Sequence, residues 1–77
     1  MPGKNAAPRS SLRGLRTFCI AARYESFKAA ASDLFITASA VSQQIKSLED
    51  ELGVKLFERG SRDLALTEEG AALFEAL

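Results

Sequence analysis

Residues 26–52 carry two helical repeats of apolar residues, separated by a break of only three residues, 35–37. In each repeat the apolar side chains recur three and four residues apart, which places them on one face of a helix. The first repeat comprises Phe27, Ala30, Ala31 and Leu34, and the second comprises Val41, Ile45, Leu48 and Leu52. Because so short a break keeps the two helices in contact, and alanines allow a close approach, the segment predicts a helix-turn-helix.

The second helix has residues that favour helix ends and a distinct polar face. Thr37 is predicted to cap its start, because a threonine oxygen accepts a hydrogen bond from a first-turn amide. Gly53 follows the last apolar residue, where a left-handed backbone favours glycine. A face that reads the major groove of DNA is typically short, polar and singly basic, although a plain solvated face has the same pattern. Opposite the apolar repeat lie Ser39, Ser42, Gln43 and Lys46.

Another helix is predicted before this motif. Residues 1–10 lack periodicity and are predicted to form a disordered arm, and Ser11 is predicted to cap a helix over 12–24. The other side of this helix carries Ile20 and Tyr24 beside Arg13 and Thr17, a second apolar patch that indicates a second contact surface. The predicted core stripe comprises Leu12, Leu15, Phe18, Cys19 and Ala22.

After Gly53 the pattern changes to two short β-capable segments, 54–59 and 64–67, around a turn-rich loop. These segments predict a two-stranded hairpin, or wing. Arg59 and Arg62 fall at its base and tip, where they are either phosphate or minor-groove contacts or ordinary surface charges. Because two strands alone are marginally stable, the wing is expected to lean on the helices through Leu56, Phe57, Leu64 and Leu66.

A last helix is predicted over 67–77, with Thr67 as its cap and two acids in its first turn. Its apolar stripe is either part of the intrachain core or, together with Ile20 and Tyr24, a dimer contact. The pattern runs to the last residue, so we expect this helix to continue in a longer protein as a linker. The stripe comprises Gly70, Leu73, Phe74 and Leu77.

Composition excludes several classes of function. The chain has 77 residues, enough for one small domain, and contains one cysteine and no histidine. An internal disulfide framework and the usual zinc sites are therefore excluded. We find no nucleophile paired with a base, no Gly-rich phosphate loop, no secretory signal and no membrane-spanning run. We therefore expect no enzyme activity, no cofactor, no metal, no membrane partner and a cytoplasmic location.

The charges are unevenly distributed although the net charge is zero. Residues 1–48 carry seven basic and two acidic side chains, a net charge of +5. Residues 49–77 carry three basic and eight acidic side chains, a net charge of −5. Such a separation indicates a polar molecule with one basic face, as a nucleic-acid-binding protein needs.

Three motifs in order carry a family resemblance. The first is Phe27-x-x-Ala-Ala-x-x-Leu, and the third is Leu66-Thr-x-x-Gly. Between them, residues 40–59 read Ala-Val-Ser-x-Gln-Ile-x-x-Leu-Glu-x-x-Leu-Gly-Val-x-Leu-Phe-Glu-Arg. Over residues 12–77 the chain thus resembles the N-terminal domain of LysR-type transcriptional regulators. The resemblance implies a mainly α winged helix-turn-helix over 11–66, with a three-helix core and a two-stranded wing, followed by the start of a linker helix over 67–77.

The resemblance also implies site residues. Positions matching Ala38, Ser39, Ser42 and Gln43 face bases or nearby phosphates in the family, and the polar pattern adds Lys46. Gln43 replaces the family's commonest arginine, and Ala38 and Ser39 replace its commonest glutamine and proline. A bidentate guanine contact is thereby lost, and an adenine contact becomes available to Gln43. The predicted backbone or wing contacts are Thr37, Lys28, Arg59 and Arg62, and the predicted dimer contacts are Ile20, Tyr24, Leu73, Phe74 and Leu77.

The implied partner is double-stranded DNA, in the form of an interrupted palindromic promoter site bound by a homodimer. For the full-length protein the resemblance further implies a tetramer, contact with RNA polymerase, and a small effector bound by a C-terminal domain absent from this chain. One alternative stays open: a winged-helix module for protein interaction or dimerisation without DNA binding. The zero net charge slightly favours that alternative, and salt-dependent binding to duplex DNA separates the two.

Overall fold

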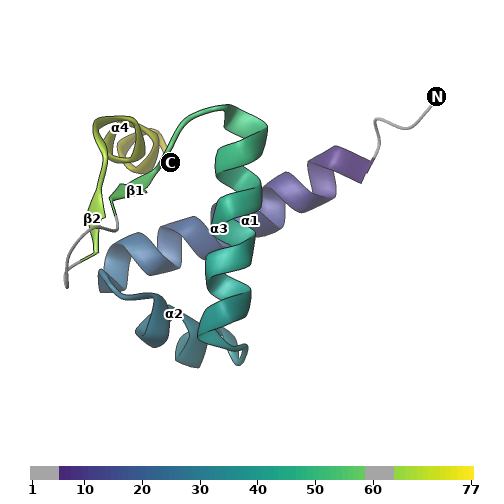
Figure 1. The fold of residues 1–77 in the computed structure, drawn as a ribbon, viewed down its shortest axis with the longest axis vertical. Coiled ribbons are helices and arrows are strands. Elements are labelled where there is room, and N and C mark those ends of the chain that lie inside the picture. The colour runs from purple at the N-terminus through teal and green to yellow at the C-terminus, as the bar shows by residue number, and fades with distance from the viewer. Residues whose placement is uncertain (1–5, 59–63) are drawn as a thin grey trace.

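The computed structural model describes residues 6–58 and 64–77, with side chains from residue 12 onward. Within these residues three helices pack together and a small antiparallel sheet lies at one side with the last helix (Figure 1). The mainly α winged helix-turn-helix prediction is therefore confirmed. In chain order the elements are α1 Ala6–Tyr24, α2 Phe27–Leu34, α3 Ala38–Leu52, β1 Phe57–Glu58, β2 Ala65–Leu66 and α4 Glu68–Ala76.

α1 begins earlier than the sequence predicts. Residues 6–10 are helical rather than part of an irregular arm, so Ser11 lies inside the helix and does not cap it. The early start is physically reasonable because alanine is the strongest helix former, and Pro8 lies in the first turn, where no helical partner exists for an N–H. The first half of α1 extends away from the other helices (Figure 1). Leu12 is consequently 68% exposed, and its assignment to the core is wrong.

The ends of α2 and α3 are held by local hydrogen bonds. The Ser26 hydroxyl accepts from the amide of Ala29 at 3.0 Å and thereby caps α2. The Thr37 hydroxyl accepts from the amide of Ala40 at 3.0 Å and caps α3, as predicted. Gly53 ends α3 with φ of 76°, in the left-handed region that the sequence assigns to it. Both ends of the second helix of the motif are therefore encoded locally.

The turn between α2 and α3 separates two adjacent apolar side chains. Phe35 ends α2 with φ of 59°, and its ring is 93% exposed. Ile36 instead packs against the hydrophobic core. The backbone reverses direction here, so only one of the two side chains is directed inward.

The core lies where α1, α2 and α3 cross. Small residues allow α1 and α3 to approach closely, since a Cβ atom added to Gly14 of α1 would lie 3.2 Å from the Leu48 Cβ of α3. The predicted outer patch on α1 included Thr17, and for this residue the prediction is wrong. Thr17 is only 2% exposed, because it lies where α1 crosses α3. Leu52 is 48% exposed because the last turn of α3 passes beyond the core. The buried apolar residues are Phe18, Ala21, Ala22, Ala30, Ala31, Val41, Ile45, Leu48, Leu56 and Phe57.

The wing is attached to the helices by its aromatic residue. β1 pairs with β2 in the register Phe57 to Leu66. The Phe57 ring centroid lies 5.5 Å from that of Phe18 and 5.4 Å from that of Phe27. Leu64 and Leu66 are partly buried against the same core, so the predicted docking of the wing is confirmed. Arg59 and Arg62 lie outside the described residues.

α4 closes the core on the side of the wing. The Thr67 hydroxyl accepts from the amide of Gly70 at 2.9 Å, which confirms the predicted cap. The Phe74 ring packs edge-on against Phe18 at a centroid distance of 6.2 Å, and Leu73 also packs against the core. The stripe on α4 is thus in large part intrachain core, whereas Leu77 is 60% exposed.

We predict that Gly70→Ala lowers the free energy of unfolding by about 1–3 kcal/mol, because overpacking forces the backbone apart. A Cβ atom at Gly70 would lie 2.1 Å from the carbonyl oxygen of Leu56. The matched control is Gly14→Ala, where the closest atom is the Leu48 Cβ at 3.2 Å. There, the gain in helix propensity of about 1 kcal/mol offsets the crowding. Thermal unfolding followed by circular dichroism compares the two, and equal melting temperatures would contradict the prediction.

Candidate nucleic-acid interface

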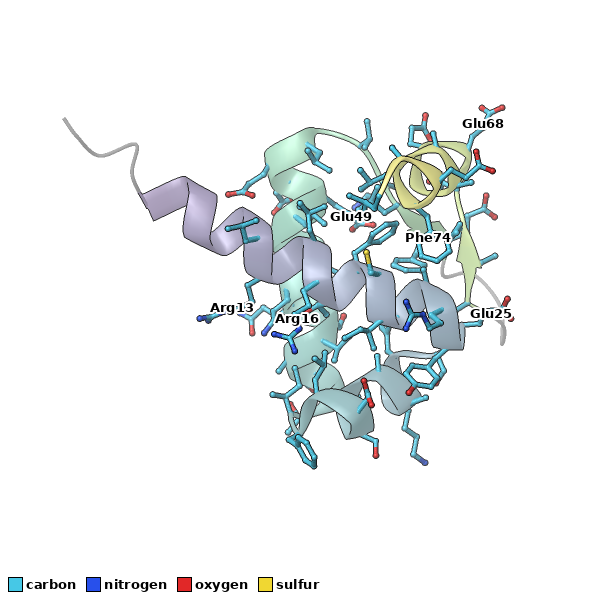
Figure 2. The ribbon with its side chains drawn as sticks, turned by 180° about the vertical axis from the view of Figure 1, so that it is seen from behind. Arg13, Arg16, Glu25, Glu49, Glu68 and Phe74 are labelled. Atoms are coloured by element: carbon cyan, nitrogen blue, oxygen red, sulfur yellow. The ribbon has the colours of Figure 1, made fainter. Side chains whose placement is uncertain are left out.

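One long face of α3 is open to solvent. In Figure 1 α3 lies in front of α1, and in Figure 2, seen from behind, α1 lies in front of α3. The buried face of α3 carries Val41, Ile45 and Leu48 against α1 and α2. The opposite face is therefore the outermost surface of the helix-turn-helix. On it Ser39, Gln43 and Lys46 are exposed, and Ser42 is half-buried at its edge. Ala38 is in line with the buried Ile45 and is exposed because it begins the helix.

The chemistry of this face suits the edges of base pairs. The Gln43 amide can both donate and accept, and the serine hydroxyls reach only a short distance from the helix. The N-terminal end of α3 adds a partial positive charge that favours phosphate. Thr37 is exposed at that end, although its hydroxyl already accepts from the amide of Ala40. Asp50 is exposed one turn beyond Lys46, so negative charge limits the favourable surface to residues 38–46 of α3.

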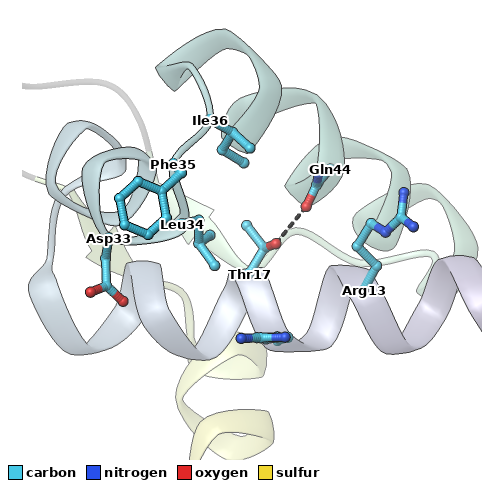
Figure 3. A pocket seen from close by; sticks show the side chains of 8 residues that line it. Arg13, Thr17, Asp33, Leu34, Phe35, Ile36 and Gln44 are labelled. Carbon is cyan, nitrogen blue, oxygen red and sulfur yellow. Dashed lines mark hydrogen bonds between the residues drawn. The ribbon is translucent and has the colours of Figure 1, made fainter.

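A polar contact behind this face orients α3. The Thr17 hydroxyl of α1 donates a hydrogen bond to the side-chain oxygen of Gln44 (Figure 3). Thr17 is almost fully buried and Gln44 half-buried, and Gln44 directly follows the exposed Gln43. The bond therefore restricts rotation of α3 about its own axis relative to α1. Sequence reasoning missed this pair, because two polar residues 27 positions apart cannot be matched before the crossing of the two helices is known.

A surface hollow of about 410 Å³ lies beside this contact, between α1, the end of α2 and α3. Figure 3 shows the exposed Phe35 ring and the Asp33 carboxylate on one side of the hollow and Arg13 on the other. Arg16 also lines the hollow, so its wall carries two basic side chains and one acidic side chain. The other lining residues are Thr17, Leu34, Ile36 and Gln44.

The remaining predicted DNA contacts are only partly placed. Lys28 is exposed in the first turn of α2, which the structure leaves accessible to a phosphate backbone. Arg59 and Arg62, predicted for the wing, fall outside the described residues. Strand β1 of the wing nevertheless packs against the same core as α3, because the Phe57 ring contacts Phe18.

The predicted dimer contacts separate into two groups. Ile20, Leu73 and Phe74 pack against the hydrophobic core of their own chain. Phe74 in particular contacts the fully buried Phe18, so acidic substitutions in this stripe would disturb the fold as well as any dimer. Tyr24 and Leu77 are 47% and 60% exposed and stay accessible to a partner.

Two basic side chains of α1 lie away from the acidic side chains of α4 (Figure 2). Arg13 and Arg16 project from α1, whereas Glu68 lies at the far end of the molecule on α4 (Figure 2). Glu69 and Glu75 are also exposed on α4. Among the described residues, no group of three histidine, cysteine, aspartate or glutamate side chains is arranged to hold a metal ion. The same residues contain no helix that is both long and apolar enough to span a bilayer.

A helix-turn-helix with an exposed polar recognition helix and an adjacent two-stranded wing defines a winged helix-turn-helix domain of the DNA-binding type. Comparison with known families agrees: residues 12–71 match the model of the bacterial regulatory helix-turn-helix proteins of the lysR family. The chain belongs to this family.

Individual relatives support the same assignment. The chain is 60% identical over 63 residues to the glycine cleavage system transcriptional activator of Escherichia coli, covering 82% of this chain and 21% of that protein. It is 53% identical over 66 residues to the transcriptional activator AmpR of Citrobacter freundii, covering 86% of this chain and 23% of AmpR. The chain thus spans little more than a fifth of the length of these relatives.

A solved structure extends the comparison to a complex with DNA. The crystal structure of the BenM DNA-binding domain with catB site 1 DNA superposes with a TM-score of 0.81 at 43% sequence identity. The match covers 84% of this chain and 70% of the BenM chain. These relatives favour a DNA-binding regulator over the alternative of an interaction module without DNA.

We predict that Thr17 and Gln44 are energetically coupled by about 1 kcal/mol, the net value of a typical intramolecular hydrogen bond. Thr17→Val and Gln44→Met each remove one partner while keeping most of the side-chain volume, and the double variant removes both. Chemical denaturation of the four proteins gives the coupling as the departure from additivity. Fully additive losses would show that the pair contributes no specific hydrogen bond.

Proposed function

We propose that this domain binds specific sequences in double-stranded DNA and thereby controls transcription from nearby promoters. The observation that carries the proposal is the solvent-exposed polar face of α3, on the outermost side of the helix-turn-helix. Selection of bound duplexes from a random pool, followed by measurement of affinity, tests it. Recovery of a common sequence supports the proposal, and a pool that stays random contradicts it.

Within this function the residues have separate roles. Ala38, Ser39, Ser42, Gln43 and Lys46 face base edges and the adjacent phosphates. Thr37 and Lys28 contact the backbone, and Arg59 and Arg62 contact phosphate or the minor groove from the wing. Phosphate contacts fix the register of the domain, and the base-facing side chains select the sequence.

The longer protein is proposed to act as a homodimer on an interrupted palindrome, with α4 continuing into the helix that joins the two subunits. Tyr24 and Leu77 are the predicted dimer contacts that stay exposed, which supports their part in such an interface. A tetramer, contact with RNA polymerase and effector sensing in a C-terminal domain belong to the same proposal. The cytoplasm, where bacterial promoters are found, is the proposed location, and enzyme activity is not part of the function.

We predict a steep salt dependence of DNA binding despite the zero net charge of the chain. If about four to six phosphates are neutralised per chain, log affinity falls with log salt concentration with a slope of roughly −3.6 to −5.4. Fluorescence anisotropy with the selected duplex measures this slope. A flat response would favour the interaction-module alternative.

We also predict that Gln43 and Arg62 affect binding in different ways. Gln43→Ala removes an amide from the recognition face and should lose about 1–3 kcal/mol of discrimination at one base position if its contact is bidentate. Arg62→Ala removes a charge and should weaken binding to all sequences more evenly. Affinities for the selected duplex, its single-base variants and random DNA decide between these patterns. Equal losses on specific and random DNA for Gln43→Ala would remove it from the base-reading surface.

A further inference from the structure

Glu49 is a buried carboxylate that connects α3 to the segment entering the wing. It lies one turn before the end of α3 and is only 3% exposed. Its Oε2 atom accepts hydrogen bonds from the amides of Leu56 at 2.8 Å and Phe57 at 3.3 Å. A charged acceptor makes stronger hydrogen bonds than a neutral one, and burial strengthens them further. The recognition helix is therefore tied directly to residues 56 and 57.

The same short segment is held from its other side by the start of α4. The amide of Thr67 donates to the carbonyl oxygen of Leu56 at 3.0 Å, and its hydroxyl donates to the carbonyl oxygen of Lys55 at 2.6 Å. Gly70 approaches the Leu56 carbonyl so closely that no side chain fits between them. Glu49 and Thr67 also line one surface hollow, together with Lys55, Phe57 and Glu58.

We propose that Glu49, Leu56, Phe57, Thr67 and Gly70 form a joint that sets the angle between the recognition helix α3 and α4. This inference rests on the proposed function, in which two chains pair through the continuation of α4. In such a pair, the joint determines how far apart and at what mutual rotation the two α3 helices are presented. Glu49 and Thr67 are then positioning residues for the spacing of the two DNA half-sites, although neither is proposed to touch DNA.

A small change in the angle between α3 and α4 at this joint would change the spacing of the two recognition helices. α4 has nine described residues, so it is about 13 Å long, and a tilt of about 15° moves its far end by about 3.5 Å. That displacement equals about the rise of one base pair in B-DNA. Adding one base pair to a spacer also rotates one half-site by about 34° relative to the other, since a turn contains about 10–10.5 base pairs.

The experiment uses the longer protein, in which α4 continues and two chains pair, and compares four variants of it on selected DNA in which two half-sites are separated by spacers of different length. Glu49→Met removes the acceptor but keeps the side-chain volume, and Glu49→Gln keeps an acceptor oxygen. Thr67→Val removes the hydroxyl, and Thr67→Ser keeps it. The readout is the ratio of affinities for the preferred spacer and for spacers one base pair shorter or longer. A loss of folded protein lowers all of these affinities by the same factor, so the ratio is insensitive to a purely stabilising role.

We expect the longer wild-type protein to prefer one spacer by about tenfold, because a recognition helix about 34° out of phase meets its groove poorly. Glu49→Met and Thr67→Val should flatten or shift this preference, whereas Glu49→Gln and Thr67→Ser should retain it. If Glu49→Met fails to fold, the Thr67 pair decides. A preference unchanged in Glu49→Met or Thr67→Val, or absent from the longer wild-type protein while it binds duplex DNA, overturns the joint. A longer wild-type protein that binds no duplex overturns the proposed function instead.

Discussion

Burial of the Phe18 ring joins parts of the chain that are far apart in the sequence. The ring lies in α1 with no exposed surface and contacts Phe57 of the wing and Phe74 of α4. Burial of one aromatic side chain contributes about 1.5–3 kcal/mol, and favourable ring pairs add about 0.5–1.5 kcal/mol each. In a domain of this size, that is a large share of the total stability. The wing and α4 therefore fold onto the helix-turn-helix as parts of one core.

This shared core leaves the outer face of α3 free for recognition. Val41, Ile45 and Leu48 supply the buried apolar contacts of that helix, whereas Ser39 and Gln43 on its polar face are exposed. Substitutions at Ser39 or Gln43 can consequently alter this surface while the fold is retained.

Local signals made most of the fold predictable from the sequence. The caps at Thr37, Gly53 and Thr67 depend on neighbouring residues only, and the apolar repeat of α3 identifies its buried face except at the last turn. The helical period likewise predicts the polar face with Ser39, Ser42, Gln43 and Lys46, whereas Ala38 came only from the family resemblance. Their roles toward DNA stay predictions.

Features that depend on how elements cross were not predictable. From the sequence, Glu49 is only one of several acidic residues in the C-terminal part. Its hydrogen bonds with the amides of Leu56 and Phe57 form only when the wing folds back on α3. The exposure of Leu12 depends on how far α1 extends past the bundle, and the burial of Thr17 depends on where α3 crosses it. Gly70 has the helical period of a core position, and the close approach of the Leu56 carbonyl becomes visible only in three dimensions.

The separation of charge between α1 and α4 affects the way in which the chain meets a polyanion. With no net charge, it has no long-range attraction to DNA, and salt screens charges beyond about 8–10 Å in any case. Within that range the opposite poles produce a torque, which turns the basic side toward the duplex and the acidic helix α4 away from it.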